Sequence, residues 1–261
     1  CYAMNPKDYD EYLPFMEAVI KEYHGIEGPV KHITNWELST PAIAAKLPPG
    51  GKLDLTKLGL GTTSMRVRVG RNLAAFPLPG AMTKQDRIDM ENSMIEAFKK
   101  LIADPAYGGN YYSLTPGSPY EISSEKYKDL VKKHIMFKDM DADPYLKSAG
   151  ISSDWPYGRG CWMSEDSKKI IWFGEEDQLR IMVMKKGFLI NEVFSELKEL
   201  LDTVESIDGI DFATSEKYGY VTSCPSNLGT GMRASLHLKL PNLTYTKGGG
   251  VRSEKEAKKV A

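Results

Sequence analysis

Apolar side chains recur at spacings of three and four residues in three long stretches of the chain, and this spacing places them on one face of a helix. The stretches cover residues 8–23, 83–104 and 191–207. Thr83 and Asp86 have the spacing of a capping box at the start of the second stretch, and Pro105 would end it. We therefore predict three amphipathic helices, each with one face packed on a core.

Shorter segments carry the alternation or the apolar run that is typical of β-strands. They cover residues 64–69, 169–173, 179–184, 218–223 and 234–240. Several of them alternate polar with apolar side chains, so one face of the sheet would be buried while the other carries polar groups. This pattern predicts an α+β fold, built on one mainly antiparallel sheet flanked by helices, which we expect on one face.

The stretch at residues 25–61 has no periodic pattern, because prolines and the Gly50-Gly51 pair interrupt it. We place a domain boundary near residue 60. Residues 1–40 would be the C-terminal part of a small helical domain, residues 41–60 a linker, and residues 61–261 the domain that contains the sheet.

Both ends of the chain suggest a piece of a longer protein. Ser253 and Glu256 have capping-box spacing, so a helix should begin there, yet the chain stops at Ala261 after barely two turns. The first residue is Cys1 rather than Met. We expect that the sequence is cut within a helix at its C-terminal end.

Composition narrows the possible partners and location. The 34 Lys and Arg residues nearly balance the 35 Asp and Glu residues, so the net charge of −1 gives no long-range attraction to nucleic acid or to a membrane. No apolar run approaches the roughly 20 residues of a membrane span. The three widely spaced cysteines fit a reducing compartment, and we expect a cytoplasmic protein in which Cys161 is a core residue.

Arg66 and Arg68 lie two residues apart in a predicted strand, so both side chains project from the same face. Two planar guanidinium groups can hold phosphate oxygens through charge-assisted hydrogen bonds. The alternative is a solvated face of an edge strand, since exposed charges are common.

Arg180 begins another predicted strand directly after the acidic run Glu175-Glu176-Asp177. An arginine in an otherwise apolar strand requires an anionic partner. The acidic run is either a surface turn between two strands or a set of carboxylates placed at a strand end for chemistry.

The segment from Cys224 to Arg233 joins two predicted strands through turn residues. Gly229 and Gly231 allow backbone amides to approach an anion, and Arg233 and His237 would share one face of the following strand. A lone cysteine is more often a buried apolar residue, but the neighbouring Ser226 hydroxyl can stabilise a thiolate at Cys224. Loop and strand together can hold a nucleotide.

These motifs, in this order, resemble those of the phosphagen kinases, the ATP:guanidino phosphotransferases that include creatine and arginine kinases. The likeness covers nearly the whole chain and rests on Arg66-Val67-Arg68 with Gly70-Arg71-Asn72, on residues 172–180, and on residues 224–243. It implies reversible transfer of the γ-phosphoryl group of MgATP to a guanidino nitrogen. It also implies a helical N-terminal domain, of which residues 1–40 would be a remnant, and an antiparallel-sheet catalytic domain at residues 61–261.

The resemblance also implies roles for particular residues. Arg66, Arg68, Arg180 and Arg233 would hold the nucleotide phosphates, and His134 and His237 would lie near the adenosine. Glu176 would grip the guanidinium group and assist its deprotonation, and Cys224 would contact that group from another side. The expected ligands are ATP or ADP, Mg²⁺ and a small guanidino substrate, with no metal bound by protein side chains alone, in a monomer or homodimer.

The sequence departs from the family pattern at Met65, Gly174 and Gln178, where Ser or Thr, Asn and His are usual, and these changes would alter nucleotide contacts. The family's loop that closes over the guanidino substrate would lie before Cys1, and a second closing loop would lie after Ala261. Two alternatives therefore stay open: a catalytically silent nucleotide-binding polypeptide and a protein-arginine kinase. The Cys-Pro-Ser run favours the small-molecule enzymes over the protein-arginine kinase.

Overall fold

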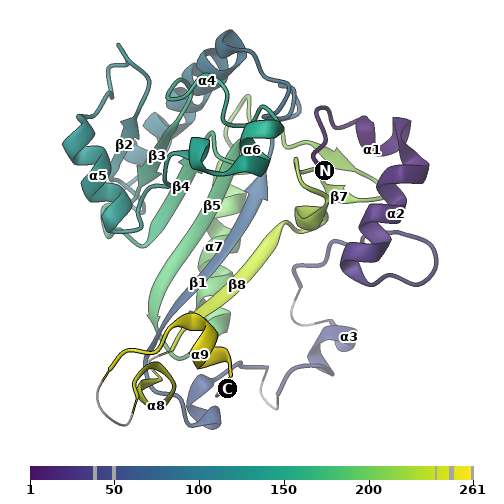
Figure 1. Cartoon of the computed structure of the whole chain (residues 1–261), viewed down its shortest axis with the longest axis vertical. Helices are drawn as coiled ribbons and strands as arrows, with labels where there is room; N and C mark the ends of the chain where they lie inside the picture. The colour runs from purple at the N-terminus through teal and green to yellow at the C-terminus, as the bar shows by residue number, and fades with distance from the viewer. Residues whose placement is uncertain (38–39, 49–50, 239, 247–249, 260–261) are drawn as a thin grey trace.

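A six-stranded antiparallel sheet forms the centre of the molecule (Figure 1). The computed structural model describes residues 1–37, 40–48, 51–238, 240–246 and 250–259. The strands of this sheet are β1 (Thr63–Arg71), β2 (Asn110–Ser113), β3 (Gly160–Met163), β4 (Lys169–Phe173), β5 (Leu179–Gly187) and β8 (Met232–His237). Their order is β2-β3-β4-β5-β1-β8, and every neighbouring pair is antiparallel. The predicted fold class is confirmed.

One face of the sheet is the main core. Alternate residues of the central strands, such as Val67, Val69, Ile181 and Val183, are buried together with apolar residues of two long helices. These helices are α4 (Lys84–Ala103) and α7 (Ile190–Glu205), as the periodicity predicted. The capping box at the start of α4 also forms as predicted.

The opposite face is partly covered, which corrects the expectation of helices on one face only. Helices α5 (Ser124–Lys132) and α6 (Pro144–Ser148), with the 3₁₀ turn η2 (Met140–Ala142), lie over this face. Leu130, Phe137 and Met140 pack with Cys161 of β3 and Trp172 of β4. Cys161 is fully buried as predicted, and burial raises the pKa of its thiol to about 12.

The N-terminal helical segment breaks where one helix was predicted. The structure has α1 (Asp8–Glu11) and α2 (Leu13–His24), because Pro14 has no N–H to continue the hydrogen bonds of α1 and instead occupies the first turn of α2. Tyr9, Met16 and Ile20 are buried against Leu78, Tyr218 and Val221, which come after β1 in the chain. The division into domains stays a prediction.

The remaining elements are short. They are α3 (Pro41–Ala44), η1 (Leu55–Leu58), β6 (Thr214–Ser215), β7 (Gly219–Tyr220), η3 (Pro225–Asn227), α8 (Pro241–Thr244) and α9 (Glu254–Lys258). The strand predicted at residues 218–223 is reduced to β7, because the Val221 and Ser223 amides bond to Ala213 and Asp177 instead of to a strand. The helix predicted from Ser253 forms, with the reciprocal bonds of a capping box to Glu256. Within the described residues, no helix has the length and apolar character needed to cross a membrane.

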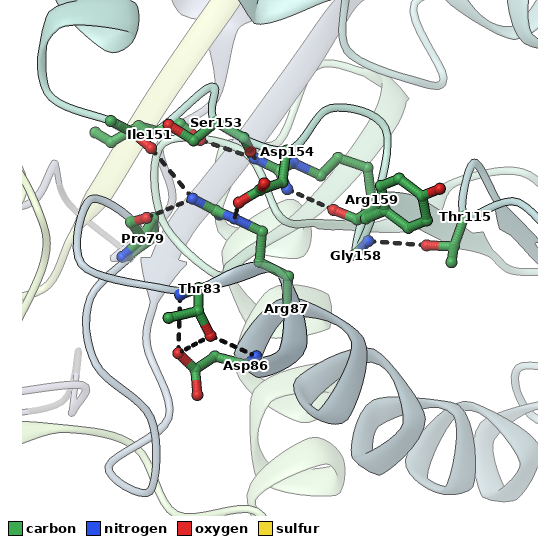
Figure 2. Close-up of polar contacts among 12 residues, drawn as sticks. Pro79, Thr83, Asp86, Arg87, Thr115, Ile151, Ser153, Asp154, Gly158 and Arg159 are labelled. Carbon is green, nitrogen blue, oxygen red and sulfur yellow. Dashed lines mark hydrogen bonds and ion pairs between the residues drawn. The ribbon is translucent and has the colours of Figure 1, made fainter.

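Figure 2 shows two buried arginines that fix the loop before β3 through its backbone. The Arg159 guanidinium donates to the carbonyl oxygens of Ile151 (2.8 Å) and Ser153 (3.1 Å), and Arg87 donates to those of Pro79 (2.8 Å) and Gly150 (3.1 Å). Burial, with repulsion from Arg87, lowers the pKa of Arg159 to about 9. Helices α5 and α6, with the residues between them, are called the α5–α6 cover below. The loop before β3 supports this cover, because the Trp155 ring in the loop packs on Phe137, which lies between the two helices in the chain.

We predict that Leu197→Ala, at a fully buried position on α7, lowers the free energy of unfolding by about 2–5 kcal/mol, because it leaves a cavity against β1 and β5. The exposed Glu199→Ala on the same helix should change it by less than about 0.5 kcal/mol. Denaturant unfolding measures both values. A small effect of Leu197→Ala would contradict the core described here.

Candidate functional site

Strand pairing brings four arginines onto one face of the sheet. Arg68 on β1 lies directly opposite Arg233 on β8, and Gly70, two residues further along β1, lies opposite Arg180 on β5. Directly opposed residues of antiparallel strands project from the same face. Arg66 is on this face too, opposite Ser235, and so is His237, opposite Ser64. This is the face that does not carry the main core.

Burial and the neighbouring guanidinium charges lower the pKa values of Arg66 and Arg68. Burial first, and then the charges of Arg180 and Arg233, lower the pKa of Arg66. Burial and the neighbouring arginines lower the pKa of Arg68 to about 10, with Glu175 opposing. Among the described residues, the buried Nε of Arg66 has no hydrogen-bond partner. Positive charges that are desolvated and repel one another favour the binding of an anion with several oxygens.

Among the residues that the structure describes, Arg180 is the arginine of this face that forms an ion pair with a carboxylate. Its Nη1 donates to Oε1 of Glu175 (2.9 Å), and its Nη2 lies 2.6 Å from Oε2 of the same residue. The guanidinium carbon is 5.3 Å from the centre of the Trp172 ring. Oε2 of Glu176 is more distant, at 3.5 Å. The sequence predicted an anionic partner for Arg180 but did not assign this role to Glu175.

Glu176 has a weaker contact with Arg180 than Glu175 has, a hydrogen bond of 3.5 Å from Nη2 to its Oε2, and its environment changes its acidity. Burial first, and then repulsion by Asp177 and Glu175, raise the pKa of Glu176 to about 7, although Arg180 and Arg68 act in the opposite direction. A carboxylate with a pKa near neutrality can accept and return a proton.

Asp177 connects the acidic turn to two other parts of the site. Its buried Oδ1 accepts hydrogen bonds from Asn72 Nδ2 and from the Ser223 amide, both at 2.8 Å. A side chain at Gly70 would place its Cβ 2.8 Å from Oδ2 of Asp177, so this approach depends on glycine. The end of β1, the acidic turn and the residue before Cys224 are thereby held together.

Cys224 lies half-buried at the start of η3. The Ser226 hydroxyl donates to its Sγ at 2.9 Å, and the Thr222 hydroxyl donates to its carbonyl oxygen at 2.9 Å. Tyr2 lies near both Cys224 and Glu176: burial, then the charges of Glu176 and Cys224, raise the pKa of its phenol to about 12. The sequence analysis missed Tyr2, since no local pattern distinguishes it from the other tyrosines near the N-terminus.

We call the sheet face that carries Arg66, Arg68, Arg180 and Arg233 the arginine face. A cleft of about 920 Å³ lies between this face and the α5–α6 cover. Of the predicted site residues it is lined by Arg66, Arg180, His134 and His237, and Glu175 and Trp172 lie on its wall. Arg68 and Arg233 continue the same sheet face, while Glu176 and Cys224 lie on the side toward Tyr2. The sequence analysis missed the lining residues between Phe137 and Leu146, because the apolar ones, such as Phe137 and Met140, resemble ordinary core and the charged ones, such as Lys138, resemble an exposed loop.

The three departures from the family pattern lie away from this cleft. Met65 is buried in the main core. Gln178 is fully buried, where its Oε1 accepts from the Leu73 amide (2.7 Å) and its Nε2 donates to the Pro77 carbonyl (2.8 Å). Gly174 has φ +75°, and a Cβ there would lie 2.0 Å from the Gly158 carbonyl oxygen. They shape the fold around the site, and none of them is among the residues that line the cleft.

Residues 89–257 match the sequence model of a family described as ATP:guanido phosphotransferase, C-terminal catalytic domain. The chain belongs to this family.

Other guanido phosphotransferases are similar over most of the chain. An arginine kinase (Oct f 2) of Amphioctopus fangsiao is 36% identical over 93% of this chain, and a taurocyamine kinase of Schistosoma mansoni is 38% identical over 90%. The solved substrate-free duplicated taurocyamine kinase of S. mansoni superposes with a TM-score of 0.77 over 94% of the chain, at 31% identity. The chain spans 64% of the length of the first relative, 29% of the second and 32% of the solved structure.

We predict that thermal stability depends on pH through Glu176. The pKa of Glu176 in the folded protein, about 7, lies above its ordinary value of 4.5, so the folded state binds this proton more tightly. The resulting stability is complete below about pH 4.5 and is lost as the pH rises to about 7. Glu176→Gln should therefore flatten the fall in Tm between pH 5 and 8 and raise Tm at pH 8. The exposed Glu216→Gln should keep the wild-type slope, and an unchanged slope in Glu176→Gln would contradict the altered pKa.

Proposed function

We propose that this guanido phosphotransferase chain forms the nucleotide and phosphoryl site of a phosphagen kinase. In the reaction, the γ-phosphoryl group of MgATP is transferred reversibly to a guanidino nitrogen of a small molecule. The observation that supports this most strongly is the set of four arginines on one sheet face, next to the carboxyl of Glu176 with its pKa near 7. Such a face neutralises phosphoryl oxygens, and such a carboxylate accepts a proton.

On the nucleotide side, the arginine face would hold the phosphates while the cleft takes the rest of the nucleotide. Arg66 and Arg68 present desolvated guanidinium groups, and Arg180 is fixed in orientation by Glu175. Arg233, on the edge strand, is exposed and completes the set. His134 and His237 line the cleft and would lie near the adenosine.

Mg²⁺ would bind mainly through the nucleotide. Within the part of the chain that the structure describes, no three His, Cys, Asp or Glu side chains are grouped closely enough to hold a metal ion. Mg²⁺ commonly keeps several waters and binds through substrate phosphates with one or two carboxylates, so the chain fits an ion that arrives with ATP. When bound, it would neutralise charge on the phosphate oxygens.

On the guanidino side, Glu176 would orient the guanidinium group and take its proton. The guanidino nitrogen attacks the γ-phosphorus, the bond from that phosphorus to the bridging oxygen of ADP breaks, and the proton passes to the carboxylate of Glu176. Cys224 would contact the same group from another side, and the Tyr2 phenol, on which the charges of both Glu176 and Cys224 act, would lie beside them. We place this activity in the cytoplasm, in a monomer or homodimer.

The test is an ATP-dependent assay of the full-length protein with creatine, arginine, taurocyamine, glycocyamine and lombricine. We expect turnover with at least one of these compounds. ATP binding without turnover of any of them would support a silent nucleotide-binding protein instead. Phosphorylation of arginines in a protein, with the free compounds inert, would support a protein-arginine kinase.

Within that assay, we predict that Glu176→Gln lowers kcat by about 10²–10⁴-fold, because the proton acceptor is lost. Affinity for MgADP should stay nearly unchanged. The exposed Glu216→Gln serves as the control and should leave both quantities unchanged. An equal loss of nucleotide affinity in Glu176→Gln would place this carboxylate on the nucleotide side of the site.

A further inference from the structure

We propose that Arg71 is a positioning residue that sets the place of Arg233 against Arg68 without touching the ligand itself. The inference rests on the proposed function, because it concerns the phosphate-binding face. Arg71 ends β1 and lies opposite Leu179, two residues beyond Val69, so its side chain projects from the core face and not from the arginine face. It is fully buried. It therefore cannot contact phosphates bound on the other side of the sheet.

The contacts of Arg71 are few for a buried cation. Its Nη1 donates to the carbonyl oxygens of Gly70 (2.7 Å) and Thr230 (2.8 Å), and its guanidinium carbon lies 3.5 Å from the centre of the Tyr220 ring. The Tyr220 hydroxyl donates to Glu205 at 2.9 Å. Within the described residues, Arg71 has no carboxylate within ion-pair distance and its Nε and Nη2 have no hydrogen-bond partner, so the charge of Glu205 and the Tyr220 phenol act on it from a greater distance or through the ring. Burying such a charge costs free energy, so a gain in folding stability does not explain why an arginine occupies this position.

The feature that these contacts hold is the turn that leads into β8. Gly229 and Gly231 have φ of +90° and +59°, and the carbonyl of Thr230 between them accepts from Arg71. The Gly70 amide donates to the Gly231 carbonyl at 3.1 Å, and Gly229 exchanges two backbone hydrogen bonds with Tyr220. A Cβ at Gly231 would lie 2.9 Å from the Gly70 carbonyl oxygen and 3.3 Å from Arg71 Nη1. The backbone conformation of this turn is therefore fixed by hydrogen bonds to β1 on one side and to Tyr220 on the other.

The conformation of this turn sets the position of Arg233. β8 begins at Met232, immediately after the turn, and pairs only with β1 within the described sheet. Arg233 lies opposite Arg68, and each adds to the positive charge that surrounds the other. Repulsion pushes an edge strand outward, because no second neighbour holds it. Arg71 opposes that movement at the first residues of the strand.

The first test measures amide hydrogen exchange without any nucleotide. In Arg71→Met, exchange of residues 229–235 should be about tenfold faster than in the wild type, because the turn opens more often. Arg87→Met removes an equally buried arginine that bonds to Pro79 and Gly150, and exchange of residues 229–235 should stay unchanged in it. If Arg71→Met does not fold, Tyr220→Leu removes the ring beneath the guanidinium group and should give the same change. Unchanged exchange in the folded variant would overturn the proposal.

The second test is a double-mutant cycle on the affinity for MgADP, measured by isothermal titration calorimetry. Arg71→Met should weaken binding about five- to tenfold when Arg233 is present, but less than about twofold in an Arg233→Ala background. A purely structural role would give the same loss in both backgrounds, and that result, like the absence of any loss, would overturn the proposal. If the wild type does not bind MgADP, the proposed function fails, and the exchange measurement still decides whether Arg71 holds the turn.

Discussion

Four guanidinium groups that repel one another lie on one sheet face, and holding them there is the constraint that the rest of this structure has to satisfy. Arg66, Arg68 and Arg233 lie within one region of a sheet face, and Arg180 joins them from β5. The free energy that keeps them there comes from the reverse face, where Val67, Val69 and their neighbours are buried against α4 and α7. The core fixes the strands, and the strands fix the charges. The arginine face, which we propose binds phosphate, is thus held in place by the apolar face behind it.

The three carboxylates of the acidic turn at residues 175–177 differ in how closely they pair with positive charge. Glu175 accepts a hydrogen bond from Arg180, and the buried Asp177 accepts hydrogen bonds from Asn72 and from the Ser223 amide. Both carboxylates therefore have defined structural partners. Glu176 between them is left in a desolvated position next to two other acids. The same low solvent access that lowers the pKa of Arg68 therefore raises that of Glu176. In the proposed function, the arginines that would bind phosphate and the carboxylate that would accept a proton therefore lie next to each other.

Much of this could be predicted from local sequence patterns. The periodicity of α4 and α7, the alternation of β1 and the capping box at Thr83 depend on nearby residues, and each appears as expected. The strands β2 and β3 are four residues long and carry no alternation strong enough to detect. Which acid pairs with Arg180 depends on a turn that begins at Gly174 with φ +75°, and no spacing rule gives that. Glu176 and Cys224, whose charges act on Tyr2, lie more than 170 positions further along the chain, so no local pattern could bring these residues together.

The central claim is that the arginine face binds phosphate groups, and thermal unfolding with matched ligands tests it most directly. The measurement compares ADP, inorganic triphosphate and adenosine at equal concentration with the same chain. A ligand at about 100 times its Kd adds about 2.7 kcal/mol to the free energy of unfolding, which is a visible shift in Tm. We predict that ADP and triphosphate raise Tm while adenosine leaves it nearly unchanged, because the phosphates supply most of the interaction. An equal shift with adenosine, or no shift with either phosphate compound, would contradict the account.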